Sequence, residues 1–218
     1  MGIIPLGDAS RRPMRWPVAT ATIIAVNVVV FIMELMGGDA FVLRWSVIPA
    51  HVSQGQDLVT ILTAMFMHGS WSHILGNMVF LWAFGPEIED AMGSLRYTIF
   101  YLAGGVVAML AQVAANPHST VPNLGASGAI AAVMGAFLVA FPTDQIRTAV
   151  VFWVFVRTKF VPAALFIGLW FVLQLVSVGT VAQTETGGVA YLAHVGGFAF
   201  GAFCTRILEA TGQISTHD

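Results

Sequence analysis

The 218-residue chain is 57% hydrophobic and only 9% charged, and its mean hydropathy is +0.83. A soluble globular domain carries about a quarter charged residues, so this composition excludes one and indicates an integral membrane protein. The formal net charge of −2 suggests no nucleic-acid partner, and the single cysteine, Cys204, excludes an internal disulfide.

Several stretches are long and apolar enough to cross a bilayer, which takes about 20 helical residues. We expect spans over residues 17–36, 70–86, 96–114, 124–141, 160–178 and 189–208. The first follows a basic cluster, but it is too long for a signal peptide and no clear cleavage site ends it, so we expect it to remain. The sequence therefore predicts a single all-α membrane domain over residues 1–218, a compact bundle of six transmembrane helices.

Two segments between these spans are apolar but interrupted. Residues 37–69 contain Gly37, Gly38, Pro49 and Gly55 as well as charged residues, which favours an embedded loop with short helices over another span. Residues 145–159 are bracketed by basic side chains. We expect this second segment either at the membrane interface or as an extension of the fifth span.

The distribution of Lys and Arg predicts the orientation in the membrane. With a cytoplasmic N-terminus, only Arg44 of the nine basic residues lies outside. The other eight fall on the cytoplasmic side: Arg11, Arg12, Arg15, Arg96, Arg147, Arg157, Lys159 and Arg206. Both termini are then cytoplasmic, and the short tails favour a multi-pass protein of a prokaryotic plasma membrane.

Polar residues inside a membrane are costly and point to function. His73 and Asn77 lie in the second expected span, Ser127 in the fourth and His194 in the sixth. All three spans run from outside to inside, and each polar residue falls within the first two turns, roughly 10 Å from the outer edge. We therefore expect these side chains to meet at one depth, in a site that opens to the outer face.

Small residues suggest where two of these spans touch. Gly125 and Gly128 flank Ser127, and Gly197 and Gly201 follow His194 in a G-x-x-x-G pattern. Such residues let two helix backbones approach closely, so the fourth and sixth spans are expected to pack with Ser127 and His194 near the contact.

This combination points to nucleophilic chemistry. A lone membrane serine usually bonds its own helix, and a lone histidine often only joins two helices, but together they form a nucleophile and its base. The start of a helix also presents amides that stabilise an oxyanion. The only acidic residue inside a span is Glu34, near the outer end of the first. We therefore expect a Ser–His dyad rather than a triad.

Four stretches, taken in order, resemble the rhomboid family of intramembrane serine proteases: "MHGSWSHILGNMVFLWAFG", "EIEDAMGSLRYTIFYLAGG", "GASGAIAAVMG" and "AHVGGFAFG". The resemblance covers nearly the whole chain. It implies Ser127 as nucleophile, His194 as general base, and His73, Asn77 and the Ser127 amide as the oxyanion hole. It also implies cleavage within the transmembrane segments of other proteins, among membrane lipid, without a metal or cofactor.

The resemblance implies supporting roles as well. His68 matches a histidine that supports the loop above the site, and Glu89, Gly93 and Arg96 match a motif in which Glu and Arg pair structurally. One departure from the family concerns the contacts of the catalytic histidine. Many relatives place an aromatic residue one turn after the serine, against the histidine, where this chain has Ala131.

Three other functions fit less well. A non-catalytic rhomboid-like binder or chaperone usually lacks the serine or the histidine. A transporter needs polar residues across the membrane, whereas the cytoplasmic halves of the second, fourth and sixth spans are apolar. A metal site at His68, His73 and His194 lacks a one-face spacing and a nearby acidic ligand.

Overall fold

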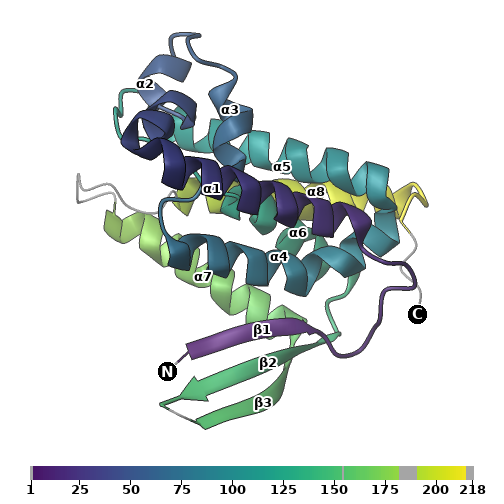
Figure 1. Cartoon of the computed structure of the whole chain (residues 1–218). Coiled ribbons are helices and arrows are strands. Elements are labelled where there is room, and N and C mark those ends of the chain that lie inside the picture. Colours follow the sequence, from purple (N-terminus) through teal and green to yellow (C-terminus); the bar gives the residue numbers. More distant parts are fainter. Residues whose placement is uncertain (1, 154, 182–190, 215–218) are drawn as a thin grey trace.

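The structure is a computed structural model that describes residues 2–153, 155–181 and 191–214. A bundle of helices lies beside a small β-sheet (Figure 1). The longer helices are α1 (Val18–Trp45), α4 (Trp71–Met92), α5 (Ser94–Ala115), α6 (Ser127–Ala140), α7 (Ala163–Val181) and α8 (Tyr191–Ala210). Each expected span thus corresponds to a helix, although the first residues expected for the sixth lie outside the described part.

Within the described part, three helices are long and apolar enough to cross a membrane by themselves: α1, α5 and α8. Helix α6 and residues 163–176 of α7 are apolar but shorter. Helix α4 is long enough, but Glu87, Glu89 and Asp90 lie near its end. The protein is therefore a helical membrane protein, while the count of six spans stays a prediction.

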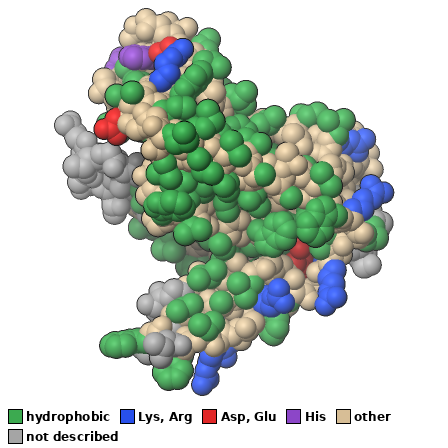
Figure 2. All heavy atoms as spheres, in the orientation of Figure 1, with side chains coloured by type: hydrophobic (Ala, Val, Ile, Leu, Met, Phe, Trp, Pro, Cys, Tyr) green, Lys and Arg blue, Asp and Glu red, His purple; other side chains and the backbone are tan. Residues whose placement is uncertain are grey.

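Hydrophobic side chains cover much of the helical surface in the view of Figure 2. Lys and Arg gather at one end and along the sheet, and a smaller charged group lies at the opposite end (Figure 2). An apolar band between two charged ends is the surface that a bilayer requires.

The segment between α1 and α4 is more helical than its glycines suggested. Gly38 has a φ of 59° and kinks α1, but the helix resumes and ends only at Trp45. Short helices follow, namely α2 (Pro49–Val52), α3 (Thr60–Thr63) and the 3₁₀ helix η1 (Ala64–Phe66). The expected loop with short helices is therefore present, and the chain leaves α1 later than residue 36.

The all-α expectation is wrong because residues 145–162 form a β-hairpin. Strands β2 (Gln145–Phe152) and β3 (Phe155–Pro162) pair antiparallel, and β1 (Gly2–Asp8) adds to the other edge of β2, with Ile3 opposite Val150. The hairpin is rich in Val, Thr and Phe, which fit a pleated sheet. Helix α7 begins after it, at Ala163. Residues 145–159 therefore do not extend the fifth span, while their place at the membrane interface stays a prediction.

Helices α6 and α8 pack backbone against backbone, as the small residues predicted. A Cβ on Gly197 would overlap the Gly128 carbonyl, and a Cβ on Gly201 would overlap that of Ala132. A Cβ on Gly135 would overlap the carbonyl of Phe198 in the same way. Residues 128–137 of α6 are all buried, so α6 is the central helix of the bundle.

The expected pair between Glu89 and Arg96 is wrong. Glu89 instead accepts hydrogen bonds from the Ala19 and Thr20 amides, from Thr20 Oγ1 and from Ser94 Oγ, at 2.6–2.8 Å. A carboxylate at the start of α1 satisfies amides that have no partner within that helix. Arg96 donates to the carbonyl of Gln213 at 3.2 Å.

Gly93 lies between α4 and α5 with a φ of 79°, a conformation that favours glycine. It allows α5 to start at once after α4, beside the start of α1. Glu89 thus joins the start of α5, through Ser94, to the start of α1, through Ala19 and Thr20, and does so without Arg96.

Replacing Gly201 with Ala tests the contact between α6 and α8. The added methyl group has to displace the Ala132 backbone, and overpacking of this kind costs about 1–3 kcal/mol of unfolding free energy. Thermal unfolding in detergent micelles measures it. Gly168→Ala on α7 is the matched control, because its Cβ would meet nothing within 4 Å. Equal unfolding temperatures for the two variants would contradict the packing.

Strand β1 should dock on the sheet in a pH-dependent way. Burial, with Asp144 nearby, raises the pKa of Asp8 from 3.8 to about 6. The folded state prefers the neutral acid, so docking is strongest below about pH 4 and weakens as the pH rises through 6. Amide exchange of β1, corrected for intrinsic rates, should therefore be faster at pH 7 than at pH 5. In Asp8→Asn this difference should shrink, and an unchanged difference would exclude Asp8 as the cause.

Candidate active site

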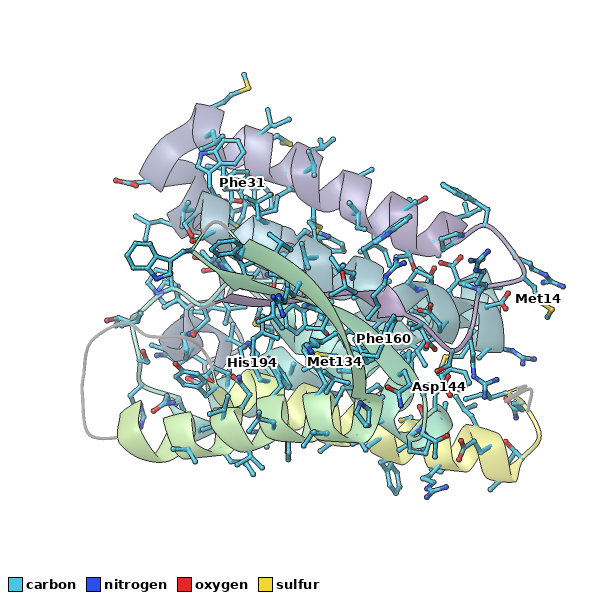
Figure 3. All side chains as sticks on the ribbon, turned by 90° about the horizontal axis from the view of Figure 1, so that it is seen from below. Met14, Phe31, Met134, Asp144, Phe160 and His194 are labelled. Atoms are coloured by element: carbon cyan, nitrogen blue, oxygen red, sulfur yellow. The ribbon has the colours of Figure 1, made fainter. Side chains whose placement is uncertain are left out.

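Ser127 is the first residue of α6, and its side chain meets the histidine of α8. The distance from Ser127 Oγ to His194 Nε2 is 2.7 Å, within hydrogen-bonding range. His194 is 6% exposed and lies inside the bundle, toward the end away from Met14 and Asp144 (Figure 3). The backbone contact between α6 and α8 sets this distance, because both residues precede the glycines that pack there.

The other ring nitrogen of His194 also has a partner. His194 Nδ1 lies 2.7 Å from Oε1 of Gln174 on α7. Two aromatic rings flank the imidazole: the ring centroid of Trp170 is 5.9 Å away, and that of Tyr191 is 6.2 Å away. The aromatic contact missing at Ala131 is thus supplied by α7 and by the first residue of α8.

Gln174 is absent from the residues that the sequence singled out. The signal was present, since Gln174 is the one polar side chain within residues 163–176. A lone amide in such a run needs a partner inside the protein. The sequence did not indicate which partner that would be.

His73 lies beside Ser127 because Gly125 leaves room for its ring. A Cβ on Gly125 would lie 3.0 Å from His73 Nε2 and 3.5 Å from Ser127 Oγ. Gly125 also has a φ of 137°, which a larger residue rarely adopts. The start of α4 fixes His73 in turn, where Ser70 Oγ accepts from its amide at 3.2 Å.

Asn77 follows one helical turn after His73 and therefore shares its face of α4. It is 8% exposed, and its Nδ2 donates to no group in the described part of the chain. A buried amide donor left in this way is available to a ligand oxygen.

The segment between α1 and α4 holds the loop before α6. The Gly125 amide donates to the Ala64 carbonyl at 2.9 Å, and the backbones of Val47 and Asn123 bond each other in both directions. Two points of this segment, Val47 and Ala64, thus determine the position of residues 123–126, and with it the start of α6.

His68 and Glu34 support this segment from the side of α1. Glu34 Oε2 accepts from the His68 amide at 2.8 Å, and both residues are buried. The His68 ring lies 5.1 Å from the ring of His73, centroid to centroid. His68 thus lies between α1 and the proposed oxyanion site, and the one acidic residue expected within a span bonds this loop.

A search of the described residues finds no group of three or more His, Cys, Asp or Glu side chains that could hold a metal ion. The arrangement suits acid–base chemistry. An unprotonated His194 Nε2 can accept the Ser127 proton, and the first amides of α6 lie beside the hydroxyl without partners in their own helix.

Comparison with known proteins identifies the family. A family model of the Rhomboid domain matches residues 55–210, which is most of the chain. The chain belongs to the rhomboid family. The match includes every residue of the Ser127 and His194 site described above except Glu34 and Val47.

Curated relatives of this rhomboid chain come from several kinds of organism. "Rhomboid protease GluP" of Bacillus subtilis (strain 168) is 30% identical over 129 residues, 56% of this chain and 24% of the relative. "Presenilin-associated rhomboid-like protein, mitochondrial" of Homo sapiens is 34% identical over 96 residues, which are 42% of this chain and 24% of the relative. "Rhomboid-like protein 11, chloroplastic" of Arabidopsis thaliana is 38% identical over 69 residues, which are 32% of this chain and 24% of the relative. The matched part spans about a quarter of each relative.

The contact between Glu34 and His68 can be tested by stability. Glu34→Ala leaves the buried His68 amide without an acceptor, which costs about 1–3 kcal/mol of unfolding free energy. Glu34→Gln keeps an acceptor oxygen and should lose less. Thermal unfolding in detergent measures both variants. If Ala and Gln lose the same amount, the hydrogen bond to His68 is not the reason.

Proposed function

We propose that this rhomboid protein is a serine endopeptidase that cuts a peptide bond in or near the transmembrane segment of other membrane proteins. The observation that carries the proposal is the 2.7 Å approach of Ser127 Oγ to His194 Nε2 at the start of α6. A serine hydroxyl becomes nucleophilic when an adjacent base takes its proton.

The reaction proceeds in two stages. Ser127 Oγ attacks the scissile carbonyl carbon while its proton passes to His194 Nε2, and the same proton then goes to the leaving amine as the C–N bond breaks. In the second stage His194 takes a proton from water, whose oxygen attacks the acyl ester. The proton returns to Ser127 Oγ as the ester bond breaks.

The negative charge on the carbonyl oxygen needs donors in the first stage. We assign the Ser127 amide, the His73 ring and Asn77 Nδ2 to this role. The unpartnered Asn77 Nδ2 and the place of the His73 ring beside Gly125 support the assignment. One such donor is worth about 2.7–4 kcal/mol in a transition state.

Of the three relatives described above, the one from Bacillus subtilis supports the activity, because its name is "Rhomboid protease GluP". Family members named only as rhomboid-like do not share that support, so a non-catalytic binder is the alternative outcome of the test. The serine and the histidine are both present here and in contact, which favours catalysis.

The same proposal includes six spans, cytoplasmic termini and a site that opens toward the outer face of a plasma membrane. This topology puts eight of the nine Lys and Arg residues on the cytoplasmic side, as the positive-inside rule favours. Helices α4 and α8 run in the same direction along the bundle, as this topology requires (Figure 1). Relatives named mitochondrial and chloroplastic show that the family also occupies organelles.

Loss of either dyad residue should abolish cleavage. Ser127→Ala removes the nucleophile and His194→Ala removes the base, and each should lower kcat by more than about 10³-fold. The assay uses the purified protein in detergent with a model transmembrane substrate. Gly168→Ala, on the open side of α7, is the matched control and should keep wild-type activity.

The outcomes separate the two functions. If the wild type and Gly168→Ala cleave while the dyad variants fold but do not, the protease stands. If the wild type also fails on several substrates, the binding role takes its place. Cleavage by a clean Ser127→Ala preparation would place the nucleophile elsewhere.

A further inference from the structure

We propose that Gln174 is a positioning residue that fixes the tautomer of His194, so that the site works as a Ser–His–Gln triad built from three helices. This inference rests on the proposed protease function. It adds a third member to the expected dyad and assigns to α7 a part in the chemistry.

The geometry places the imidazole between two partners. His194 Nδ1 lies 2.7 Å from Gln174 Oε1, and Nε2 lies 2.7 Å from Ser127 Oγ. Both ring nitrogens are therefore engaged at once. The ring bridges α7 and α6 while its own backbone belongs to α8, so neither partner is a neighbour in sequence.

The atom of Gln174 that faces Nδ1 determines which nitrogen carries the proton, and this atom is the acceptor Oε1. A neutral imidazole has one N–H donor and one acceptor nitrogen. When Gln174 Oε1 accepts from Nδ1–H, Nε2 keeps a lone pair and can take the Ser127 proton. The opposite tautomer carries its proton on Nε2 and is inactive as a base. Many serine proteases use a buried carboxylate to select the active tautomer.

No carboxylate in the described part of the chain bonds to His194. Glu34, the acidic residue of α1, accepts from the His68 amide instead. Gln174 thus occupies the place of the orienting acid without bringing a charge into the membrane, where an ionised group is costly.

A second side chain of α7 supports the same ring. Trp170 lies one helical turn before Gln174, so both face the same side of α7. Its ring is tilted by 39° to the imidazole, with 5.9 Å between the centroids. Together the two residues restrain the ring from one side and hold Nδ1, which leaves Nε2 directed at Ser127.

The surroundings of Gln174 offer no simpler role. Residues 163–176 contain no other polar side chain, and Leu173 and Leu175 beside it are exposed on the membrane-facing surface. An amide in hydrocarbon needs an internal hydrogen bond, and the bond shown here is to the proposed base.

The test compares four variants in kcat and KM on one transmembrane substrate. Gln174→Met keeps the length of the side chain but removes the acceptor, and Gln174→Asn keeps the amide but is one methylene too short. Gln174→Glu keeps an acceptor oxygen and has no donor when it is ionised, so its carboxylate form can select only the active tautomer. Leu175→Met, on the exposed side of α7, is the control.

We expect Gln174→Met and Gln174→Asn to lower kcat by about 10- to 10³-fold with little change in KM, since loss of the correct tautomer can cost a serine protease about 10⁴-fold. Gln174→Glu should recover at least tenfold over Gln174→Met, because its carboxylate again selects the active tautomer. Leu175→Met should match the wild type. Thermal unfolding establishes that each variant is folded.

Nitrogen-15 NMR of the imidazole provides a readout that a merely structural role would not move. The His194 signals are assigned by their loss in His194→Ala. Wild-type protein should show a protonated Nδ1 and an unprotonated Nε2, and Gln174→Met should shift toward the opposite tautomer.

The two proposals fail in different ways. If the wild type cleaves and folded Gln174→Met has the same kcat and the same tautomer, the role of Gln174 is overturned while the protease stands. Gln174→Glu no faster than Gln174→Met, with both folded, overturns the acceptor role. If nothing cleaves but the tautomer shifts in Gln174→Met, Gln174 does position His194 and the proposed activity fails.

Discussion

The close approach of the α6 and α8 backbones is the constraint on which the candidate site depends. Gly197 and Gly201 lie where a Cβ would overlap carbonyls of α6, so no larger residue allows this distance. The same contact brings Ser127 Oγ and His194 Nε2 to 2.7 Å. Association inside a bilayer has no hydrophobic driving force, and tight van der Waals packing through small residues replaces it.

The remaining elements hold the Ser127 and His194 pair and its surroundings in place. The segment between α1 and α4 fixes the loop before α6 through Ala64 and Gly125, while Glu89 holds the start of α1 against α4 and α5. Helix α7 adds Gln174 and Trp170 around the imidazole. Each of these contacts is a hydrogen bond or ring contact to a buried group. Inside a membrane no water can replace such a partner, so losing the contact costs more free energy.

The candidate site was easier to predict than parts of the fold. The depth argument placed Ser127 and His194 near one another because helical periodicity and charge bias are local signals. The hairpin of residues 145–162 was not recognised, since a short apolar run with basic residues fits a strand, an interfacial helix or the end of a span equally well. The third strand of the sheet comes from residues 2–8, which are so far from the hairpin in sequence that no local pattern indicates the pairing.

The sequence by itself determined that this is a helical membrane protein and roughly where its apolar helices lie, and it predicted that a serine, two histidines and an asparagine with flanking glycines share one depth. These follow from composition and spacing along the chain. Only the tertiary structure decided the partners of Glu89, Glu34 and Gln174. A polar side chain in an apolar run indicates that a hydrogen-bond partner is needed. Which distant group is that partner depends on how the helices pack.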